Sequence, residues 1–455
     1  MKDALWVAPS PGERKDALIG CNNVVKKSFK ANFTPIQRQF FESEFFQPIT
    51  IQAEADWLLN HDEDGQTYES FWRSFMLGGQ SVEVGHKRPT RPQTVIGTRS
   101  SKSAITTPHK SKTICIVPLG SLPKTDECLG GKSFMLWLKS FCNMFFKKAK
   151  VVILPSMSVE ETKCQYRVNQ LTGKFQLRAS DIITHLKKVK PSYAYCVIAL
   201  TMIDLYPKPS WDFVYGLASS NDGVGLFSLA RYDDIFYETW TQGKDVVRNN
   251  PDGSLDYSVF GNPILRLDGS SFQVCSKLLF RACKVMSHEI CHMFGLKHCI
   301  WSACVMNGSN HLQESDRRPA FLCPVCLRKL QTILGFDLVK RYKSLRAWAT
   351  EKFWEEFVYI EEKPQVQKSS KTGPSWARRS SLPDVTHSTV SSRKKQVKKI
   401  VASKPNLETI FASPPNQSES DKQKNAIKVA PPPLDSFSRF QQWLDDAITY
   451  LEEES

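Results

Sequence analysis

The feature that most constrains this chain is the motif His-Glu-x-x-His-x-x-Gly-x-x-His, which begins at His288 and ends at His298. Residues four apart lie on one face of a helix, so His288 and His292 can present two imidazoles to one metal ion. Gly295 predicts the end of this helix, because a helix C-terminus often needs a positive φ that glycine adopts without strain. The turn allows His298 to return as a third ligand and leaves a fourth position open, which is the arrangement of a catalytic zinc site.

Glu289 lies one step around the helix from the first histidine, within reach of a water molecule in the same site. The short pattern His-Glu-x-x-His alone also occurs by chance in solvated helices. The glycine and the third histidine at the required spacing argue against chance. We therefore interpret the three histidines as zinc ligands and place Glu289 close enough to act on a metal-bound water without being a ligand itself.

Four cysteines follow the motif closely, namely Cys299, Cys304, Cys323 and Cys326. Four thiolates form a closed tetrahedral site, which suits a structural zinc ion rather than a catalytic one. Unrelated buried thiols are the alternative, since free cysteines are common in protein cores. The clustering of four of the 13 cysteines within 28 residues favours zinc. Met306 falls inside the loop that this site would close, which places a methionine beneath the catalytic metal.

The combined pattern resembles the archaemetzincins, a branch of the metzincin zinc metallopeptidases. The resemblance extends to residues 201–207, 222–231 and 317–319. It implies a catalytic zinc on the three histidines, Glu289 as the general base, Met306 as the Met-turn residue and a second, structural zinc on the four cysteines. The implied fold is α/β and metzincin-like, with a mixed twisted sheet, an edge strand over a long active-site helix and a small zinc-stapled C-terminal subdomain.

The same resemblance predicts where a substrate binds. Metzincins pair an extended substrate with the main chain of an edge strand. The glycine-rich stretch 223–232 alternates enough to suit a strand at or near the sheet edge, and ordinary sheet structure is the alternative. The expected substrate-binding residues are Gly223, Val224, Gly225, Leu226, Phe227 and Ser228.

A regular α/β pattern is predicted from residue 113 onward. The expected strands span 113–119, 151–154 and 195–203, and the expected helices span 134–146, 179–189 and 276–294. The run 195–203 is almost continuously apolar, as in a central strand that is covered on both faces. Thr34 and Pro35 predict the start of a helix over 34–45, Asp337 predicts a cap, and Ser180 or Asp181 should cap the helix at 179–189.

The basic character of the chain comes from two polar stretches. Residues 80–112 carry seven Lys and Arg against one acid, and residues 364–430 carry 13 against four, which accounts for the formal charge of +15. Such low-complexity charge predicts disorder rather than nucleic-acid binding. The expected organisation is an aromatic-rich N-terminal lobe (1–77), a basic linker or insert (78–112), a catalytic domain (113–361) that includes the structural zinc segment (299–326), a disordered basic tail (362–430) and a C-terminal amphipathic helix (431–455).

The composition also bears on location and partners. The chain shows no apolar signal-peptide core and no membrane-spanning run, and its odd number of cysteines favours a reducing compartment. We expect a cytoplasmic monomer that binds no membrane, with the nucleus as an alternative because of the basic run 393–399. The leading hypothesis is a metallopeptidase with two zinc ions that acts on peptides or proteins. The alternative is a zinc-organised binding protein with the same fold and little turnover.

Overall fold

The computed structural model describes residues 6–76, 112–122, 124–125, 133–234, 236, 246–261, 273–274, 276–350 and 436–453. Residues 78–111 of the predicted linker (78–112) and the predicted tail at 362–430, with its basic run 393–399, lie outside the described residues. Among the helices that the structure describes, none is long and apolar enough to cross a membrane.

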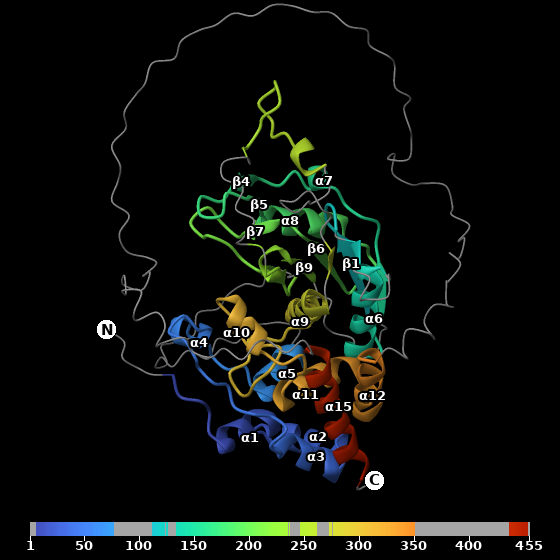
Figure 1. The fold of residues 1–455 in the computed structure, drawn as a ribbon. Helices are drawn as coiled ribbons and strands as arrows, with labels where there is room; N and C mark the ends of the chain where they lie inside the picture. The colour runs from blue at the N-terminus through green and yellow to red at the C-terminus, as the bar shows by residue number, and fades with distance from the viewer. Residues whose placement is uncertain are drawn as a thin grey trace, which may run out of the picture. The chain divides into compact units, whose positions relative to one another are not determined.

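The centre of the fold is a five-stranded mixed sheet with the strand order β3-β1-β6-β9-β8 (Figure 1). Its strands are β1 (Thr113–Pro118), β3 (Lys150–Ile153), β6 (Cys196–Thr201), β8 (Gly216–Ser219) and β9 (Val224–Ser228). Four of them run parallel, and β8 runs antiparallel to β9 at the edge. The mixed sheet and the strands predicted at 113–119, 151–154 and 195–203 are confirmed.

Side chains of the central strands alternate between two apolar layers, so both faces of the sheet are covered. Ile114 and Ile116 of β1 lie in the layer that includes α6 (Phe134–Phe145) and α9 (Ser276–Met293). Cys115 and Val117 of the same strand pack in the layer that includes α8 (Ala179–Val189). Figure 1 shows α8 and α9 on opposite sides of the sheet. All three helices occur where the sequence predicts them.

Residues 223–232 were predicted to form a strand at or near the sheet edge, and they contain β9, which lies next to the edge strand β8. The assignment of the edge position itself to these residues is wrong. Gly223 has φ +61° and closes a turn in which its N–H donates to the carbonyl of Ser219 at 2.9 Å. This turn folds β8 back along β9, so β9 pairs with β6 on one side and with β8 on the other. The residues expected to bind substrate therefore lie one strand inside the edge, namely Gly223, Val224, Gly225, Leu226, Phe227 and Ser228.

A smaller three-stranded sheet, which the sequence did not predict, supports the loop that precedes β8. It consists of β4 (Tyr166–Val168), β5 (Phe175–Arg178) and β7 (Asp204–Tyr206). Arg167 donates to the carbonyls of Pro209, Trp211 and Asp212 at 2.6–3.0 Å. These bonds fix the loop that leads into the edge strand. A two-stranded sheet pairs β2 (Lys124–Thr125) with β10 (Gln273–Val274).

The remaining helices are α1 (Pro11–Ile19), α2 (Asn23–Asn32), α3 (Pro35–Glu42), α4 (Trp57–Asn60), α5 (Tyr68–Met76), α7 (Val159–Thr162), α10 (Leu312–Arg317), α11 (Pro324–Leu334), α12 (Leu338–Trp348) and α15 (Ser436–Glu452). The predicted N-cap Thr34 forms a capping box with Gln37, and Asp337 caps α12 by accepting from the N–H of Lys340. The predicted helix over 34–45 therefore begins as expected and ends at Glu42.

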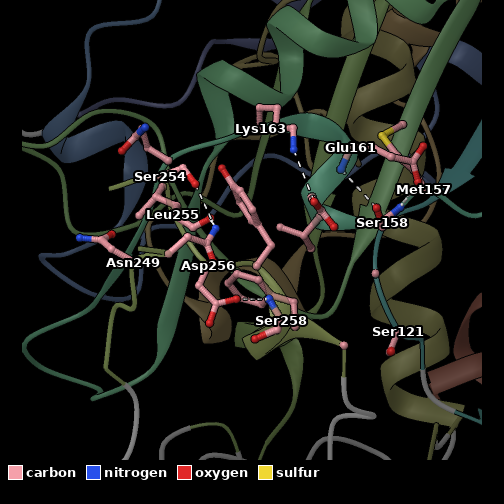
Figure 2. Close-up of a pocket in the computed structure, with 18 of the residues that line it drawn as sticks. Ser121, Met157, Ser158, Glu161, Lys163, Asn249, Ser254, Leu255, Asp256 and Ser258 are labelled. Atoms are coloured by element: carbon pink, nitrogen blue, oxygen red, sulfur yellow. Dashed lines mark hydrogen bonds and ion pairs between the residues drawn. The ribbon is translucent and has the colours of Figure 1, made fainter. Parts of the chain in front are cut away.

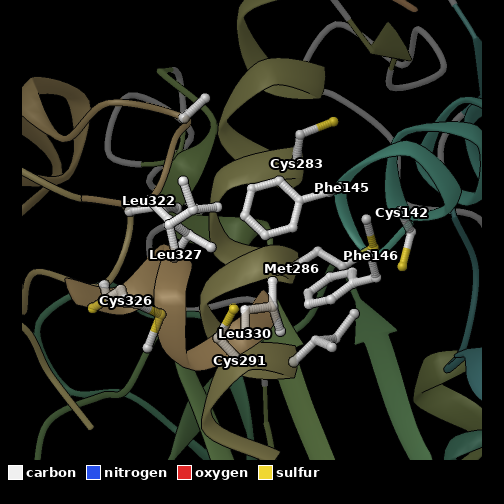
Figure 3. Packing of buried hydrophobic residues seen from close by; sticks show 14 of the residues in the cluster. Cys142, Phe145, Phe146, Cys283, Met286, Cys291, Leu322, Cys326, Leu327 and Leu330 are labelled. Atoms are coloured by element: carbon white, nitrogen blue, oxygen red, sulfur yellow. The ribbon is translucent and has the colours of Figure 1, made fainter. Parts of the chain in front are cut away.

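One apolar cluster joins helices from both ends of the chain to α9. Phe40 of α3, Met286 of α9 and Leu444 of α15 all belong to it and are fully buried. Figure 3 shows the buried side of α9 packed against neighbouring elements, with the labelled residues Met286, Cys291, Phe145, Phe146, Leu327 and Leu330. The helix α15 lies within the segment 431–455 and packs into this shared core through Leu444. The helix that carries the metal motif is thus held by a large shared core.

Candidate metal centre

The structure brings the three motif histidines together. One ring nitrogen from each of His288, His292 and His298 lies within 4.8 Å of the other two. The Nε2 atoms of His288 and His292, one turn apart on α9, are separated by 3.0 Å. Gly295 ends the helix with φ +84°, so the chain can turn and return His298 to the same point.

The other ring nitrogen of each histidine is already occupied. Each Nδ1 lies 2.7–2.8 Å from an oxygen that can only accept a hydrogen bond: the carbonyl of Val305 for His288, the carbonyl of Leu296 for His292 and a carboxylate oxygen of Glu63 for His298. Each Nδ1 must therefore carry the proton, which leaves each Nε2 lone pair for a metal ion. This donor set fits zinc.

Burial keeps two of these imidazoles in their metal-binding form. It lowers the pKa of His292 to about 4, and it holds the pKa of His288 well below the ordinary value, with the neighbouring His292 adding to the effect. Both rings are neutral at physiological pH. Only a neutral imidazole has a lone pair to offer a metal.

Glu289 lies beside the ligands and against the edge strand. Its side chain passes so close to β8 that a Cβ added at Gly216 would lie 2.4 Å from its Oε1. Burial raises the pKa of Glu289 to about 8, and the positive charge of Arg318 acts in the opposite direction. A carboxyl group perturbed in this way next to metal ligands is typical of a functional site. A cation held by the histidines would favour its charged form.

Arg318 is a site residue to which the sequence assigned no role. Its Nη1 donates to the carbonyl of Asn307 at 2.7 Å and lies 3.4 Å from Nδ1 of His288. Its backbone carbonyl in turn accepts from Nζ of the buried Lys284 at 3.1 Å. The guanidinium is therefore held next to the His288 ring by its bond to Asn307, and it adds positive charge to the centre. The resemblance at residues 317–319 was its one signal in the sequence.

Met306 is fully buried in the loop that follows the third histidine. Its carbonyl accepts from the N–H of Cys299 at 2.9 Å, and the carbonyl of the preceding Val305 orients His288. The predicted Met-turn residue thus belongs to a loop that contacts both metal clusters through its main chain.

The four cysteines form a second cluster directly behind the first. The sulfur atoms of Cys299, Cys304, Cys323 and Cys326 all lie within 4.8 Å of one another, and those of Cys299 and Cys323 are 3.5 Å apart. Burial raises the pKa of Cys304 and Cys323 well above the ordinary value, so thiolates at these two positions need a cation to compensate them. The closed, buried set fits a structural zinc ion. His298 and Cys299, although adjacent, serve different clusters.

Glu63 is the second site residue that the sequence did not reveal. It comes from the N-terminal segment, 235 residues before the histidine that it contacts. The hydrogen bond from His298 lowers the pKa of Glu63 despite the opposing effect of burial, so it is a carboxylate. The acidic run 62–64 was its one visible signal, and nothing in that run indicates which side chain reaches the candidate metal centre.

Two other features of the described residues are not part of this site. Asp56, His311 and Glu314 also lie within metal-binding distance of one another. However, Asp56 already accepts from Arg317 at 2.6 Å and from His311 at 2.9 Å, which explains the cluster as an ion-pair network. A cavity of about 1200 Å³ lies between the β3–α7 region and residues 249–261 (Figure 2), and neither the histidines nor Glu289 line it.

Comparisons with known proteins identify the family. The model of peptidase family M54 matches residues 260–332, a span that holds the histidines, Glu289 and the four cysteines. Archaemetzincin-2 of Macaca fascicularis and of Homo sapiens are each 40% identical over 339 residues, which are 73% of this chain and 84% of theirs. Archaemetzincin-1 of Mus musculus is 32% identical over 347 residues, which are 74% of this chain and 62% of that protein.

A crystal structure of an archaemetzincin from Methanopyrus kandleri aligns with 22% identity and a TM-score of 0.33, covering 50% of this chain and 97% of that one. The family assignment rests on the sequence relatives, whose identity extends over most of their length and most of this chain. The family predicted from the metal-binding motifs is thereby confirmed. The chain belongs to the archaemetzincins, the zinc metallopeptidases of peptidase family M54.

Proposed function

We propose that this chain hydrolyses peptide bonds at the histidine centre, with Glu289 as the general base. The observation that carries the proposal is the arrangement of His288, His292 and His298, whose Nδ1 atoms are all engaged and whose Nε2 atoms remain for a metal. Glu289 follows His288 directly in the sequence and is only 7% exposed. Its carboxylate is therefore shielded from bulk solvent and can act on a water molecule in the site.

The protein side of the reaction follows from these positions. His288, His292 and His298 would hold a zinc ion, which would act as a Lewis acid that makes water more acidic and polarises a carbonyl group. Glu289 accepts the proton from the attacking water and transfers it to the leaving amine. Arg318 holds its positive charge next to His288 and lowers the cost of the negative charge that develops on the substrate oxygen.

We also propose that the substrate pairs with β8. The carbonyl of Tyr215 accepts from the N–H of Ser228 of β9 at 2.9 Å. Because inward and outward main-chain groups alternate along an antiparallel pair, those of Gly216 and Ala218 face the outer edge of the sheet. An extended peptide could add there as a further strand. Gly216 lies against Glu289, so a peptide on this edge would pass the general base.

The four cysteines are proposed to hold the second zinc ion. That ion would close the segment from Cys299 to Cys326, which carries the carbonyl of Val305 that orients His288. Its contribution is therefore to the fold and only indirectly to turnover. We propose Met306 as the Met-turn residue in the same segment. Action as a monomer in the cytoplasm is our expectation from the sequence.

The test replaces Glu289 by Gln, which keeps the shape of the side chain and removes the base. Cleavage of a peptide library should fall by about 10²- to 10⁴-fold, while zinc content and melting temperature stay near those of the wild type. Glu54→Gln, an exposed position, is the matched control and should change nothing. Equal cleavage by Glu289→Gln would contradict the proposal. A wild-type protein that binds zinc and cleaves nothing would favour the alternative of a binding protein.

A further inference from the structure

The three histidines of the centre are not oriented in the same way. His288 and His292 lie on the rigid helix α9, and neutral main-chain carbonyls accept their Nδ1 protons. His298 lies on the turn after the helix, and its Nδ1 proton is accepted by the carboxylate of Glu63 at 2.7 Å. The ligand with the least regular backbone is thus the one whose Nδ1 proton is accepted by a carboxylate, and that carboxylate comes from the N-terminal segment.

Glu63 is itself fixed by its surroundings. The same Oε1 atom accepts a second hydrogen bond, from Nε1 of Trp57 at 2.8 Å. The indole ring meets the His298 ring edge-on, with centroids 4.9 Å apart, and stacks on the His61 ring at 3.7 Å. The backbone N–H of Trp57 donates to Glu314 at 2.7 Å, which anchors α4 to α10. Glu63 therefore has little freedom to leave His298.

The segment that follows Glu63 also holds the turn that carries His298. Gln66 donates to the carbonyl of Gly295 at 3.0 Å and accepts from the N–H of Lys297 at 3.1 Å. Its own carbonyl accepts from Nε1 of Trp301 at 3.1 Å and from Nζ of Lys329. Residues 57–66, which we call the clasp, therefore contact the turn on both sides of the third histidine.

Close packing shows that the clasp is fitted to this turn. Gly65 has φ +64°, and a Cβ at that position would lie 2.5 Å from Cδ1 of Ile300. A residue with a side chain would be strained by the backbone angle and would displace Ile300. The position is buried, so the contact belongs to the folded body and not to a solvated surface.

From these contacts we infer that Glu63 is a positioning residue for the third zinc ligand, so that the N-terminal segment completes the metal centre. The inference rests on the ligand role of His298 in the proposed function, and it does not depend on turnover. A carboxylate that accepts from a ligating histidine fixes its tautomer and ring orientation and makes the imidazole a stronger donor. A ligand on a turn needs such support more than one on a helix does.

The test measures zinc affinity in the full chain by competition with a chelator, for Glu63→Ala, Glu63→Gln and the control Asp64→Asn. Glu63→Ala, which removes the carboxylate, should lower the affinity for the more readily exchanged zinc ion by about 10- to 100-fold. Glu63→Gln should weaken it by less, because an amide oxygen can still accept from Nδ1 of His298. Asp64→Asn removes an exposed charge from the neighbouring residue and should leave the affinity unchanged.

Two further readouts separate positioning from a general structural role. The second zinc ion and the melting temperature of Glu63→Gln should match those of Asp64→Asn, whereas the absorption spectrum of the cobalt-substituted histidine site should shift. An unchanged affinity and spectrum in Glu63→Gln would overturn the inference, and so would an equal loss of both zinc ions. This experiment measures metal binding and no peptide cleavage. Its outcome therefore stays distinguishable from a failure of the peptidase proposal.

Discussion

The side chains at this centre are packed so closely that one added carbon atom would displace a neighbouring side chain. The approach of Gly216 to Glu289 is the clearest case, since the added Cβ of Gly216→Ala would lie 2.4 Å from the carboxylate. We expect this variant to displace Glu289 and reduce peptide cleavage at least tenfold, with zinc content retained. Peptide kinetics and metal analysis would check both statements.

Gly12→Ala is the control for that prediction, because its Cβ would meet no atom closer than 3.9 Å. Wild-type cleavage by Gly216→Ala would show that the close contact has no bearing on Glu289.

The grouping of the proposed ligand residues could be predicted from the sequence because their geometry is local. The spacing of His288 and His292 on a helix, with Gly295 as its end, brings His298 into range without help from the rest of the fold. Glu63 could not be predicted in this way. Its contact with His298 spans 235 residues, and only the packing of the whole body brings the two together.

The segment between Cys299 and Cys326 links the two metal clusters. The carbonyl of Val305 orients His288, and Asn307 bonds to the backbone of Cys299 and Cys304 at 2.7–2.8 Å. We expect Cys326→Ser to lose one zinc ion and to lower the melting temperature, because binding energy at a structural zinc site is folding energy. Cleavage should fall as a consequence. Native mass spectrometry and calorimetry would measure the two effects.

Cys21→Ser, at an exposed thiol outside both clusters, should keep both ions and its stability. If Cys326→Ser did the same, the structural zinc would have to be placed elsewhere.

Long, periodic elements were predictable, and short ones were not. The helix α8 spans the predicted residues 179–189, but it has no side-chain cap, so neither Ser180 nor Asp181 caps it as expected. The carboxylate of Asp181 accepts instead from Nε of Arg178 and from the N–H of Gln165. The strand β8 has only four residues and no apolar alternation, so the sequence assigned the edge to its neighbour. Which strand is outermost is decided by the turn at Gly223 and by tertiary pairing.

Taken as a whole, the molecule surrounds α9 with parts from the entire described chain. Phe40 near the N-terminus and Leu444 near the C-terminus are both fully buried in the core that supports the helix. The sequence predicted aromatic packing in the N-terminal lobe, and it did not predict that this lobe would contact His298, the proposed third zinc ligand. The central claim is that the chain has two zinc sites with different roles. The zinc ion at the histidines is catalytic, and the zinc ion at the cysteines stabilises the fold.

Native mass spectrometry of the full wild-type chain during stepwise chelation tests that claim most directly. We predict two zinc ions per chain, since both donor sets are complete. The first ion to leave should be the one at the histidines, which offers three ligands and an open position, and peptide cleavage should disappear with it while the fold persists. A single, tightly held zinc ion in fully active protein would contradict the account.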